Sequence, residues 1–218
     1  MKTQQAYDRI AATGIVAGMR GHFPPEVALP LAETLLKHGI SVFEFTMNSV
    51  QPVAAMQAVK QAFGDEVVAG MGTVLSAADA QNVLDAGADF VVSPAFQSDV
   101  VQTLLDADVL VAPGVATPSE AVAAWGMGVS LLKLFPIGAL GLEYYKAMFG
   151  PLNHMQFMCN GAMNAENSAQ FIKAGALAVG MGSWLTGDGT WTTQQLDARA
   201  STLTQAVRDA RASRLARA

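Results

Sequence analysis

The sequence predicts an α/β protein, a single (β/α)8 TIM barrel that spans residues 1–218 and begins with an N-terminal helix. Eight short apolar runs rich in Val, Ile, Leu and Met recur at intervals of roughly 20 to 27 residues, the length of one strand and one helix with short loops. Segments of helical character separate the runs, and glycines stand where those helices should end. A chain of 218 residues suits one domain of this kind.

The eight strands are expected where the apolar runs stand. Parallel strands that are buried on both faces have such continuous apolar sequences. The runs are GIVAGM from Gly14, SVFEFT from Ser41, EVVAGMG from Glu66, DFVVS from Asp89, VLVAP from Val109, SLLKLF from Ser130, MQFMCN from Met155 and LAVGMG from Leu177.

Helices are expected between these strands and at both ends of the chain. MKTQQAYDRIAATG predicts a short amphipathic helix. TPSE at Thr117 combines an N-cap threonine, a proline at the first helical position and a glutamate three residues after the cap; Ser76 and Asn164 are weaker starts. The segment from Thr192 predicts a helix whose arginines lie on a solvated surface. The glycines expected to end helices are Gly39, Gly64, Gly87, Gly128 and Gly175.

The alternative fold, a doubly wound open sheet, has less support. A sheet of that kind in a chain of this length would have fewer than the eight strands expected here. In addition, no G-x-G-x-x-G follows the first strand. The sequence contains no linker and no low-complexity segment.

Composition narrows the possible partners and the compartment. A net charge of −5 argues against nucleic acid or an anionic membrane as the main partner. The single cysteine, Cys159, fits a reducing compartment. No stretch approaches the length of about 20 apolar residues that spans a bilayer, and the N-terminus has no apolar signal core. We therefore expect a cytoplasmic protein.

Two ionisable residues stand inside predicted strands. Because alternate strand residues share a face, Lys133 shares one with Leu131 and Phe135, and Glu44 shares one with Val42. A structural ion pair inside the barrel, or a lysine that extends to the rim, explains the pattern. The functional alternative is a Schiff-base lysine, since desolvation lowers the pKa of a lysine and frees its amine to attack a carbonyl. Glu44 would then transfer protons.

Other polar and small residues fall at strand ends, where the active sites of such barrels lie. Arg20 is suited to bind a carboxylate. The loops after the seventh and eighth strands are the usual phosphate position in this fold. The small residues available there are Gly161, Ala162, Gly182 and Ser183, and the other strand-end residues are Thr73, Ser93, Pro94, Pro113, Gly114 and Asn160.

These residues resemble a known family, the 2-keto-3-deoxy-6-phosphogluconate and 4-hydroxy-2-oxoglutarate aldolases. The similarity runs from about Ile15 to Trp184. Its motifs occur in order as IVAGMRG, FEFTMNS, GMGTVL, FVVSPAF, APGVATPSEA, LLKLFP, YYKAMFGPL and GMGSWL. Several motifs in a fixed order are stronger support than any one of them.

The resemblance implies a (β/α)8 class I aldolase that cleaves a 2-keto-3-deoxy-6-phospho sugar acid to pyruvate and glyceraldehyde 3-phosphate. It implies a covalent Schiff base without a metal or organic cofactor, small-molecule partners only, and a homotrimer. The implied roles are Lys133 as the Schiff-base lysine, Glu44 as the acid/base, Arg20 and Thr73 at the carboxylate of pyruvate, Pro94 and Phe135 as pocket walls, and Ser183 with its neighbouring glycines at the phosphate.

Several positions depart from the family pattern. Asn48 stands where phosphogluconate-type enzymes often carry a second arginine, and MNS resembles the LNS of the phosphogalactonate-type enzymes. Asn160-Gly161-Ala162 replaces the usual Thr-Gly-Gly, and Gly18 and Met19 replace bulkier aliphatics. The reaction class follows from the resemblance, whereas the sugar epimer and the requirement for phosphate stay open. An unphosphorylated 2-keto-4-hydroxy acid is the alternative substrate.

Two other functions and several residues carry less support. A phosphosugar isomerase or epimerase on this barrel would need a second base or a metal, and a non-catalytic sugar-acid-binding protein would keep only the pocket. The histidines show no metal-ligand spacing. Cys159, Trp125 and Trp191 are interpreted as core residues. The histidines are His22, His38 and His154.

Overall fold

The apolar runs form parallel strands in the computed structural model of the chain, which describes residues 2–216. One more short strand follows the fifth run after Pro113, which has no N–H for a strand ladder, although its carbonyl accepts a hydrogen bond from the Lys133 N–H at 2.9 Å. The strands are β1 (Ile15–Met19), β2 (Val42–Thr46), β3 (Val68–Gly72), β4 (Phe90–Val92), β5 (Leu110–Ala112), β6 (Gly114–Val115), β7 (Leu132–Leu134), β8 (Phe157–Asn160) and β9 (Ala178–Met181).

The strand order closes the sheet into a barrel. Hydrogen-bonded neighbours follow the order β5-β4-β3-β2-β1-β9-β8-β7-β6. Because only Pro113 separates β5 from β6 in the chain, the two ends of this order meet at that residue. The predicted eight-stranded (β/α)8 barrel is confirmed.

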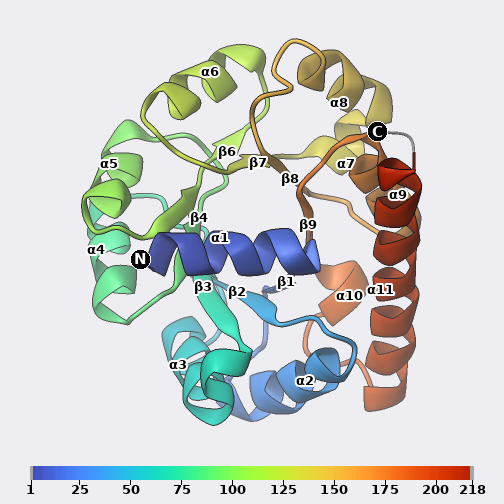
Figure 1. Cartoon of the computed structure of the whole chain (residues 1–218). Coiled ribbons are helices and arrows are strands. Elements are labelled where there is room, and N and C mark those ends of the chain that lie inside the picture. Colours follow the sequence, from blue (N-terminus) through green and yellow to red (C-terminus); the bar gives the residue numbers. More distant parts are fainter. Residues whose placement is uncertain (1, 217–218) are drawn as a thin grey trace.

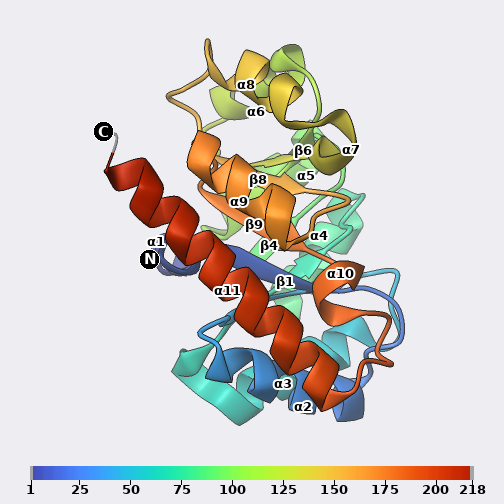
Figure 2. The ribbon, with the colours of Figure 1, turned by 90° about the vertical axis from the view of Figure 1, so that its right-hand side faces the viewer.

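Helices surround the barrel (Figure 1). Figure 2 shows the last helix along one side of the barrel, where it packs on α9 and α2. The helices are α1 (Lys2–Thr13), α2 (Pro25–Lys37), α3 (Pro52–Phe63), η1 (Gly64–Glu66), α4 (Ala77–Asp85), α5 (Ser98–Asp106), α6 (Pro118–Gly126), α7 (Ile137–Leu140), α8 (Leu142–Phe149), α9 (Ala165–Ala174), α10 (Ser183–Thr186) and α11 (Thr193–Leu215). None of the described helices is long and apolar enough to cross a membrane.

The predicted helix starts are confirmed by their caps. Thr117 and Glu120 form the expected capping box at α6. The Ser76 hydroxyl accepts a hydrogen bond from the Asp79 N–H at the start of α4. Asn164 and Asn167 cap α9 reciprocally. These bonds satisfy N–H groups that have no partner within the helix.

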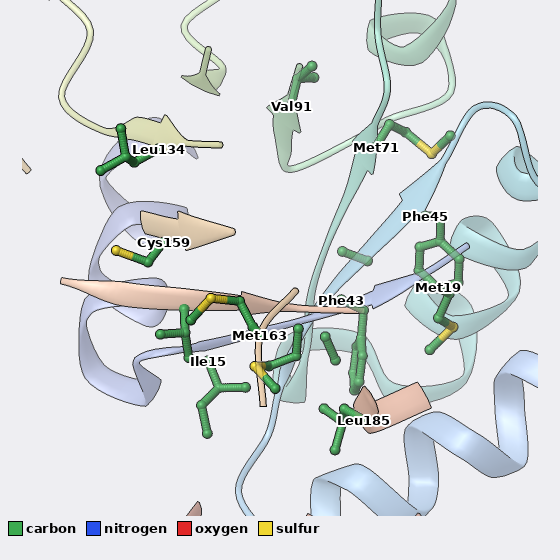
Figure 3. Close-up of a cluster of buried hydrophobic side chains, with 14 of the residues drawn as sticks. Ile15, Met19, Phe43, Phe45, Met71, Val91, Leu134, Cys159, Met163 and Leu185 are labelled. Atoms are coloured by element: carbon green, nitrogen blue, oxygen red, sulfur yellow. The ribbon is translucent and has the colours of Figure 1, made fainter. Parts of the chain in front are cut away.

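The outward faces of the strands pack against the surrounding helices. Phe43 and Phe45 of β2 point outward with Met19 and Leu134 (Figure 3), and all four are buried. Phe43 and Phe45 alternate with Glu44 along β2, and Leu134 follows Lys133 on β7, so these residues lie on the strand faces opposite the two ionisable residues.

Besides the apolar residues between strands and helices, a second apolar cluster fills the barrel interior near the N-terminal ends of the strands. Val42, Val68 and Phe90, the first residues of their strands, pack there with Ala6 and Ile10 of α1. Helix α1 crosses this end of the barrel (Figure 1). The N-terminal end of the strands is therefore closed by apolar packing, and the C-terminal end is left for a site.

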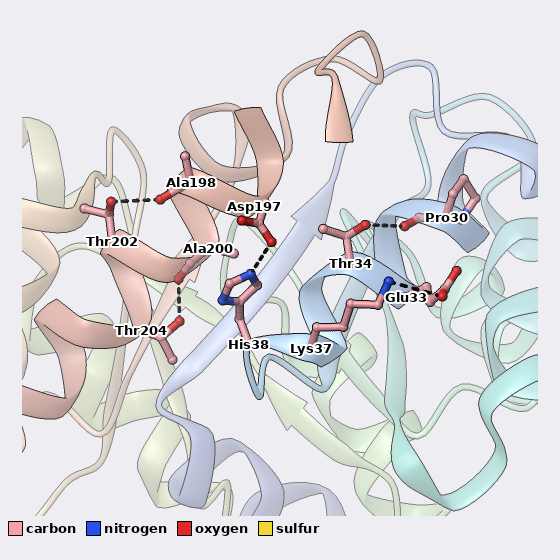
Figure 4. Close-up of polar contacts among 10 residues, drawn as sticks. All are labelled: Pro30, Glu33, Thr34, Lys37, His38, Asp197, Ala198, Ala200, Thr202 and Thr204. Carbon is pink, nitrogen blue, oxygen red and sulfur yellow. Dashed lines mark hydrogen bonds and ion pairs between the residues drawn. The ribbon is translucent and has the colours of Figure 1, made fainter. Parts of the chain in front are cut away.

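Side chains also tie α11 to its surroundings. At the C-terminus of α2, His38 Nε2 lies 2.8 Å from Asp197 Oδ1 of α11 (Figure 4). Arg211 donates hydrogen bonds to the carbonyls of Ala11 and Ala12 near the end of α1. The arginine-rich helix is therefore only partly a solvated surface.

Replacing Ile10 by Ala tests the closure by α1. Ile10 is 1% exposed, so the variant should lose about 2 to 5 kcal/mol of unfolding free energy, as buried isoleucine truncations do. Chemical denaturation measures it. Leu215→Ala, at a residue that is 78% exposed, is the control and should change stability by less than about 0.5 kcal/mol. Equal effects of the two variants would contradict the packing described.

Candidate active site

A cavity of about 760 Å³ opens at the C-terminal end of the barrel. All the residues that the sequence nominated as catalytic or substrate-binding line it. They are Arg20, Glu44, Thr73, Pro94, Lys133, Phe135, Asn160, Gly161, Ala162, Gly182 and Ser183. The strand ends thus converge as expected for this fold.

Lys133 projects into this cavity from β7. Its side chain stands above Leu131 of the interior apolar cluster, and its Nζ lies 5.1 Å from the centre of the Phe135 ring. The residue is only 8% exposed. Its register partner on β6 is Gly114, where a Cβ would lie 2.3 Å from the Pro94 carbonyl carbon. Glycine at position 114 therefore lets β6 lie close to the Pro94 backbone beside the lysine.

Lys133 and Glu44 do not form the interior ion pair that the sequence left open. Within residues 3–216 no carboxylate lies within 4.0 Å of the Lys133 ammonium. The lysine does not extend to the rim either, since it is buried. Its amine is thus held in the cavity without an anionic partner.

Glu44 reaches the cavity from β2 because the neighbouring strand β3 carries glycine at position 72. A Cβ at Gly72 would lie 1.9 Å from Glu44 Oε1, and a Cβ at Gly18 would lie 3.9 Å from Oε2. Glu44 itself is 5% exposed. At Gly18, noted in the sequence as a departure, a Cβ would make only an ordinary contact with the carboxylate, so Gly72 is the glycine that makes room for it.

Asn160 occupies a similar position on β8. Its amide lies across the Cα of Gly180, its register partner on β9, where a Cβ would be 1.8 Å from Nδ2. The Oδ1 atom is buried and has no hydrogen-bond partner among the described residues. A buried acceptor without a partner is costly, so this wall of the cavity is suited to a ligand that donates a hydrogen bond.

Two residues at the rim have backbone conformations that side chains rarely adopt. Thr73 has φ +61° and Ala162 has φ +52°. Left-handed backbone is especially unfavourable for a β-branched residue such as threonine. Strained backbone of this kind persists only where the surrounding structure holds it, and it is enriched at binding sites.

The cavity also includes residues that sequence reasoning missed. Trp191, interpreted above as a core residue, lines the cavity together with Trp184 of α10 and Arg199 of α11. That interpretation of Trp191 is therefore wrong, and so is the assignment of Arg199 to a solvated surface. Asn48, which the sequence connected with substrate choice, is exposed and does not line the cavity.

The charges around the cavity favour an anionic ligand. The lining side chains include the cations Arg20, Lys133 and Arg199 and one carboxylate, Glu44. An excess of positive charge in a concave site attracts anions.

The histidines lie away from the cavity lining. His38 contacts Asp197, and the ring of His154 stands edge-on to Trp125 at 6.2 Å. Within the described part of the chain, no three His, Cys, Asp or Glu residues are grouped so as to hold a metal ion.

Comparisons with known proteins agree with this geometry. Residues 15–200 match the family model for KDPG and KHG aldolase. The chain is 33% identical over 170 residues to the 2-dehydro-3-deoxy-6-phosphogalactonate aldolase of Escherichia coli, covering 78% of this chain and 82% of that one. It is 35% identical over 161 residues to the 2-dehydro-3-deoxy-phosphogluconate aldolase of Treponema pallidum, covering 73% and 76%.

Solved structures have the same fold. A native KDPGal structure superposes with a TM-score of 0.85 at 30% identity, covering 90% of this chain and 95% of that one. A KDPG aldolase from Legionella pneumophila, with pyruvate captured as a covalent carbinolamine intermediate, superposes with a TM-score of 0.78 at 28% identity, covering 97% and 98%.

Cys159 offers a test of the outward side of β8. It is buried among apolar side chains, as the sequence predicted, and burial raises the pKa of its thiol. Because the thiolate is the reactive form, a thiol reagent at mildly alkaline pH should label the folded chain far more slowly than the urea-unfolded chain. With an aromatic disulfide as the reagent, the absorbance of the aromatic thiol that it releases measures both labelling rates. Similar rates would contradict this placement.

Proposed function

Because the chain belongs to the KDPG and KHG aldolase family, we propose that it is a class I aldolase acting as a single barrel domain. It is a lyase that reversibly cleaves a 2-keto-3-deoxy-6-phospho sugar acid to pyruvate and glyceraldehyde 3-phosphate. The observation that carries the proposal is Lys133, a buried amine without an anionic partner inside the cavity. The covalent carbinolamine of pyruvate in the Legionella pneumophila relative supports it.

Lys133 is the nucleophile of the proposed reaction. Its neutral amine attacks the C2 ketone of the substrate and forms a carbinolamine, which loses water to form an iminium ion. The iminium accepts the electron pair of the C3–C4 bond when that bond breaks, and an enamine remains on the lysine. The buried position of Lys133 favours this role, because no carboxylate of residues 3–216 lies within 4.0 Å of the amine to compete for it.

Glu44 is the proton carrier. Its carboxylate takes the proton of the C4 hydroxyl while the C3–C4 bond breaks, so that the leaving fragment becomes an aldehyde. The carboxyl group then returns a proton to C3 of the enamine. Hydrolysis of the resulting iminium releases pyruvate and regenerates Lys133. The position of Glu44 over Gly72, facing the same cavity as Lys133, supports this role.

The remaining lining residues bind the two ends of the substrate. Arg20 and Thr73 hold the carboxylate of the pyruvate portion, and Pro94 and Phe135 wall the pocket. The loops after β8 and β9 accommodate the phosphate with their small residues. The loop residues are Gly161, Ala162, Gly182 and Ser183.

Asn160 is suited to contact a substrate hydroxyl. Its buried Oδ1 accepts no hydrogen bond from the described residues, and a hydroxyl of the sugar acid would supply one. Relatives named for phosphogalactonate and for phosphogluconate are similar to this chain to nearly the same degree. Both epimers are therefore candidate substrates.

The expected setting follows from the substrate. Phosphorylated sugar acids carry several charges and do not cross a lipid bilayer unaided, so a cytoplasmic enzyme is proposed. The homotrimer implied by the family resemblance stays a prediction, as does catalysis without a metal or organic cofactor.

Trapping with pyruvate tests the function directly. Incubation with pyruvate and borohydride should add one reduced pyruvate to Lys133, because the iminium of pyruvate is an intermediate of the reverse reaction. Peptide mass spectrometry locates the adduct. Lys133→Met should prevent labelling, whereas Lys173→Met, at an exposed residue of α9, should not. Pyruvate binding without an adduct on any lysine would overturn the proposed function.

Gly72→Ala tests the placement of Glu44. The added Cβ would overlap the Glu44 carboxylate and turn it away from the substrate. Because general acid–base catalysis contributes roughly 100- to 10,000-fold, kcat for aldol cleavage should fall on the order of 100-fold. The end-point yield of the pyruvate adduct on Lys133 should persist.

The matched control for this substitution is Gly126→Ala in α6, where an added Cβ meets no atom within 4 Å. That variant should keep the full kcat. If Gly72→Ala also keeps it, Glu44 is not the proton carrier in the position described.

A further inference from the structure

Arg199 lies between two tryptophans at the cavity. Its guanidinium carbon is 4.5 Å from the centre of the Trp191 ring and 5.1 Å from that of Trp184. Its Nη1 donates a hydrogen bond to the Trp184 carbonyl at 2.7 Å. Aromatic faces attract a cation through their quadrupole, so the two rings and the carbonyl fix the guanidinium plane.

Most of the hydrogen-bonding capacity of Arg199 is unused. A guanidinium has five N–H donors, and the bond to Trp184 is its one hydrogen bond to the described protein atoms. No carboxylate of residues 3–216 lies within 4.0 Å of it. An arginine that served only to hold α10 and α11 together would not have to line the cavity. Arg199 does line it. Its free donors are therefore available to a ligand.

The surrounding structure holds Arg199 in place. Asp197, two residues earlier on α11, bonds to His38 of α2 (Figure 4). Trp191 packs directly against Gly187, where a Cβ would lie 2.3 Å from Trp191 Cδ1. The first turns of α11 are thus attached to α2, and the segment just before α11 packs against the C-terminal end of α10. A preorganised cation binds a ligand without a large ordering cost.

We propose that Arg199 binds the phosphate of the substrate and makes the enzyme select phosphorylated aldehydes; the proposal rests on the proposed function. The charges assign this role. Arg20 serves the carboxylate and Lys133 becomes the imine, which leaves Arg199 as the remaining cation of the cavity lining. Its anchor, the Trp184 carbonyl, directly follows Ser183 of the proposed phosphate loop. A planar guanidinium binds phosphate through two parallel hydrogen bonds.

The aldol addition of pyruvate to two aldehydes tests this role. D-Glyceraldehyde 3-phosphate and D-glyceraldehyde differ only in the phosphate, so Arg199→Met should affect them differently. Methionine keeps apolar contact with the indoles but removes the charge. Charge-assisted hydrogen bonds correspond to a change of about 10- to 100-fold. The KM for the phosphorylated aldehyde should rise by that factor, while kcat/KM for glyceraldehyde should change less than about threefold.

Two further variants complete the design. Arg199→Lys keeps the charge without the planar donors and should recover part of the lost affinity for the phosphorylated aldehyde. Arg208→Met removes the same charge from an exposed position of α11 and should leave KM and kcat/KM unchanged for both aldehydes.

Pyruvate trapping on Lys133 separates the two proposals, since it involves no phosphate. If the adduct forms and Arg199→Met lowers the rates with both aldehydes equally, the role of Arg199 is overturned while the aldolase function stands. Unchanged kinetics with both aldehydes overturn it as well. If no adduct forms in the unsubstituted protein, the proposed function itself fails.

Discussion

The space available inside the barrel, near the C-terminal ends of its strands, is the constraint on which the site depends. An eight-stranded barrel has an interior just wide enough for its own side chains, so small residues on neighbouring strands help long polar residues to project inward. Glu44 lies over Gly72, Asn160 lies over Gly180, and Lys133 is paired with Gly114. In each case a Cβ on the glycine would strike either the polar side chain or the adjacent backbone. The glycines in these apolar strands are thus as necessary to the site as the ionisable residues.

The barrel interior near the N-terminal ends of the strands complements this arrangement. Val42, Val68 and Phe90 fill it, and Ile10 of α1 closes it. Lys133 stands at the boundary between this apolar layer and the open cavity, and among the described residues no carboxylate lies within 4.0 Å of its amine. A structural lysine in such a position would need an anionic partner to offset its desolvation. A lysine that forms an imine uses the absence of that partner, which is why the geometry favours nucleophilic catalysis.

Much of the fold and most of the cavity could be predicted, because both follow from local patterns. The strands are buried on both faces, so each is a continuous apolar run, and Thr117 marks its helix by a capping box. The strand-end residues met in one cavity because parallel strands direct their C-terminal ends to one side of a barrel. Arg199 and Trp191 could not be found this way, since their position depends on how α11 packs across α2 and α9. The absence of a Lys133–Glu44 ion pair likewise depends on distances between strands that are far apart in the sequence.

A crystal structure of the borohydride-reduced pyruvate adduct would test the central claim most directly. Continuous density should join Lys133 Nζ to C2 of the former pyruvate, whose carboxylate lies beside Arg20 and Thr73. The Glu44 carboxylate, still seated over Gly72, should lie within hydrogen-bonding or single-water reach of the adduct methyl carbon. A reduced adduct on another lysine, or Glu44 directed away from that carbon, would contradict the account.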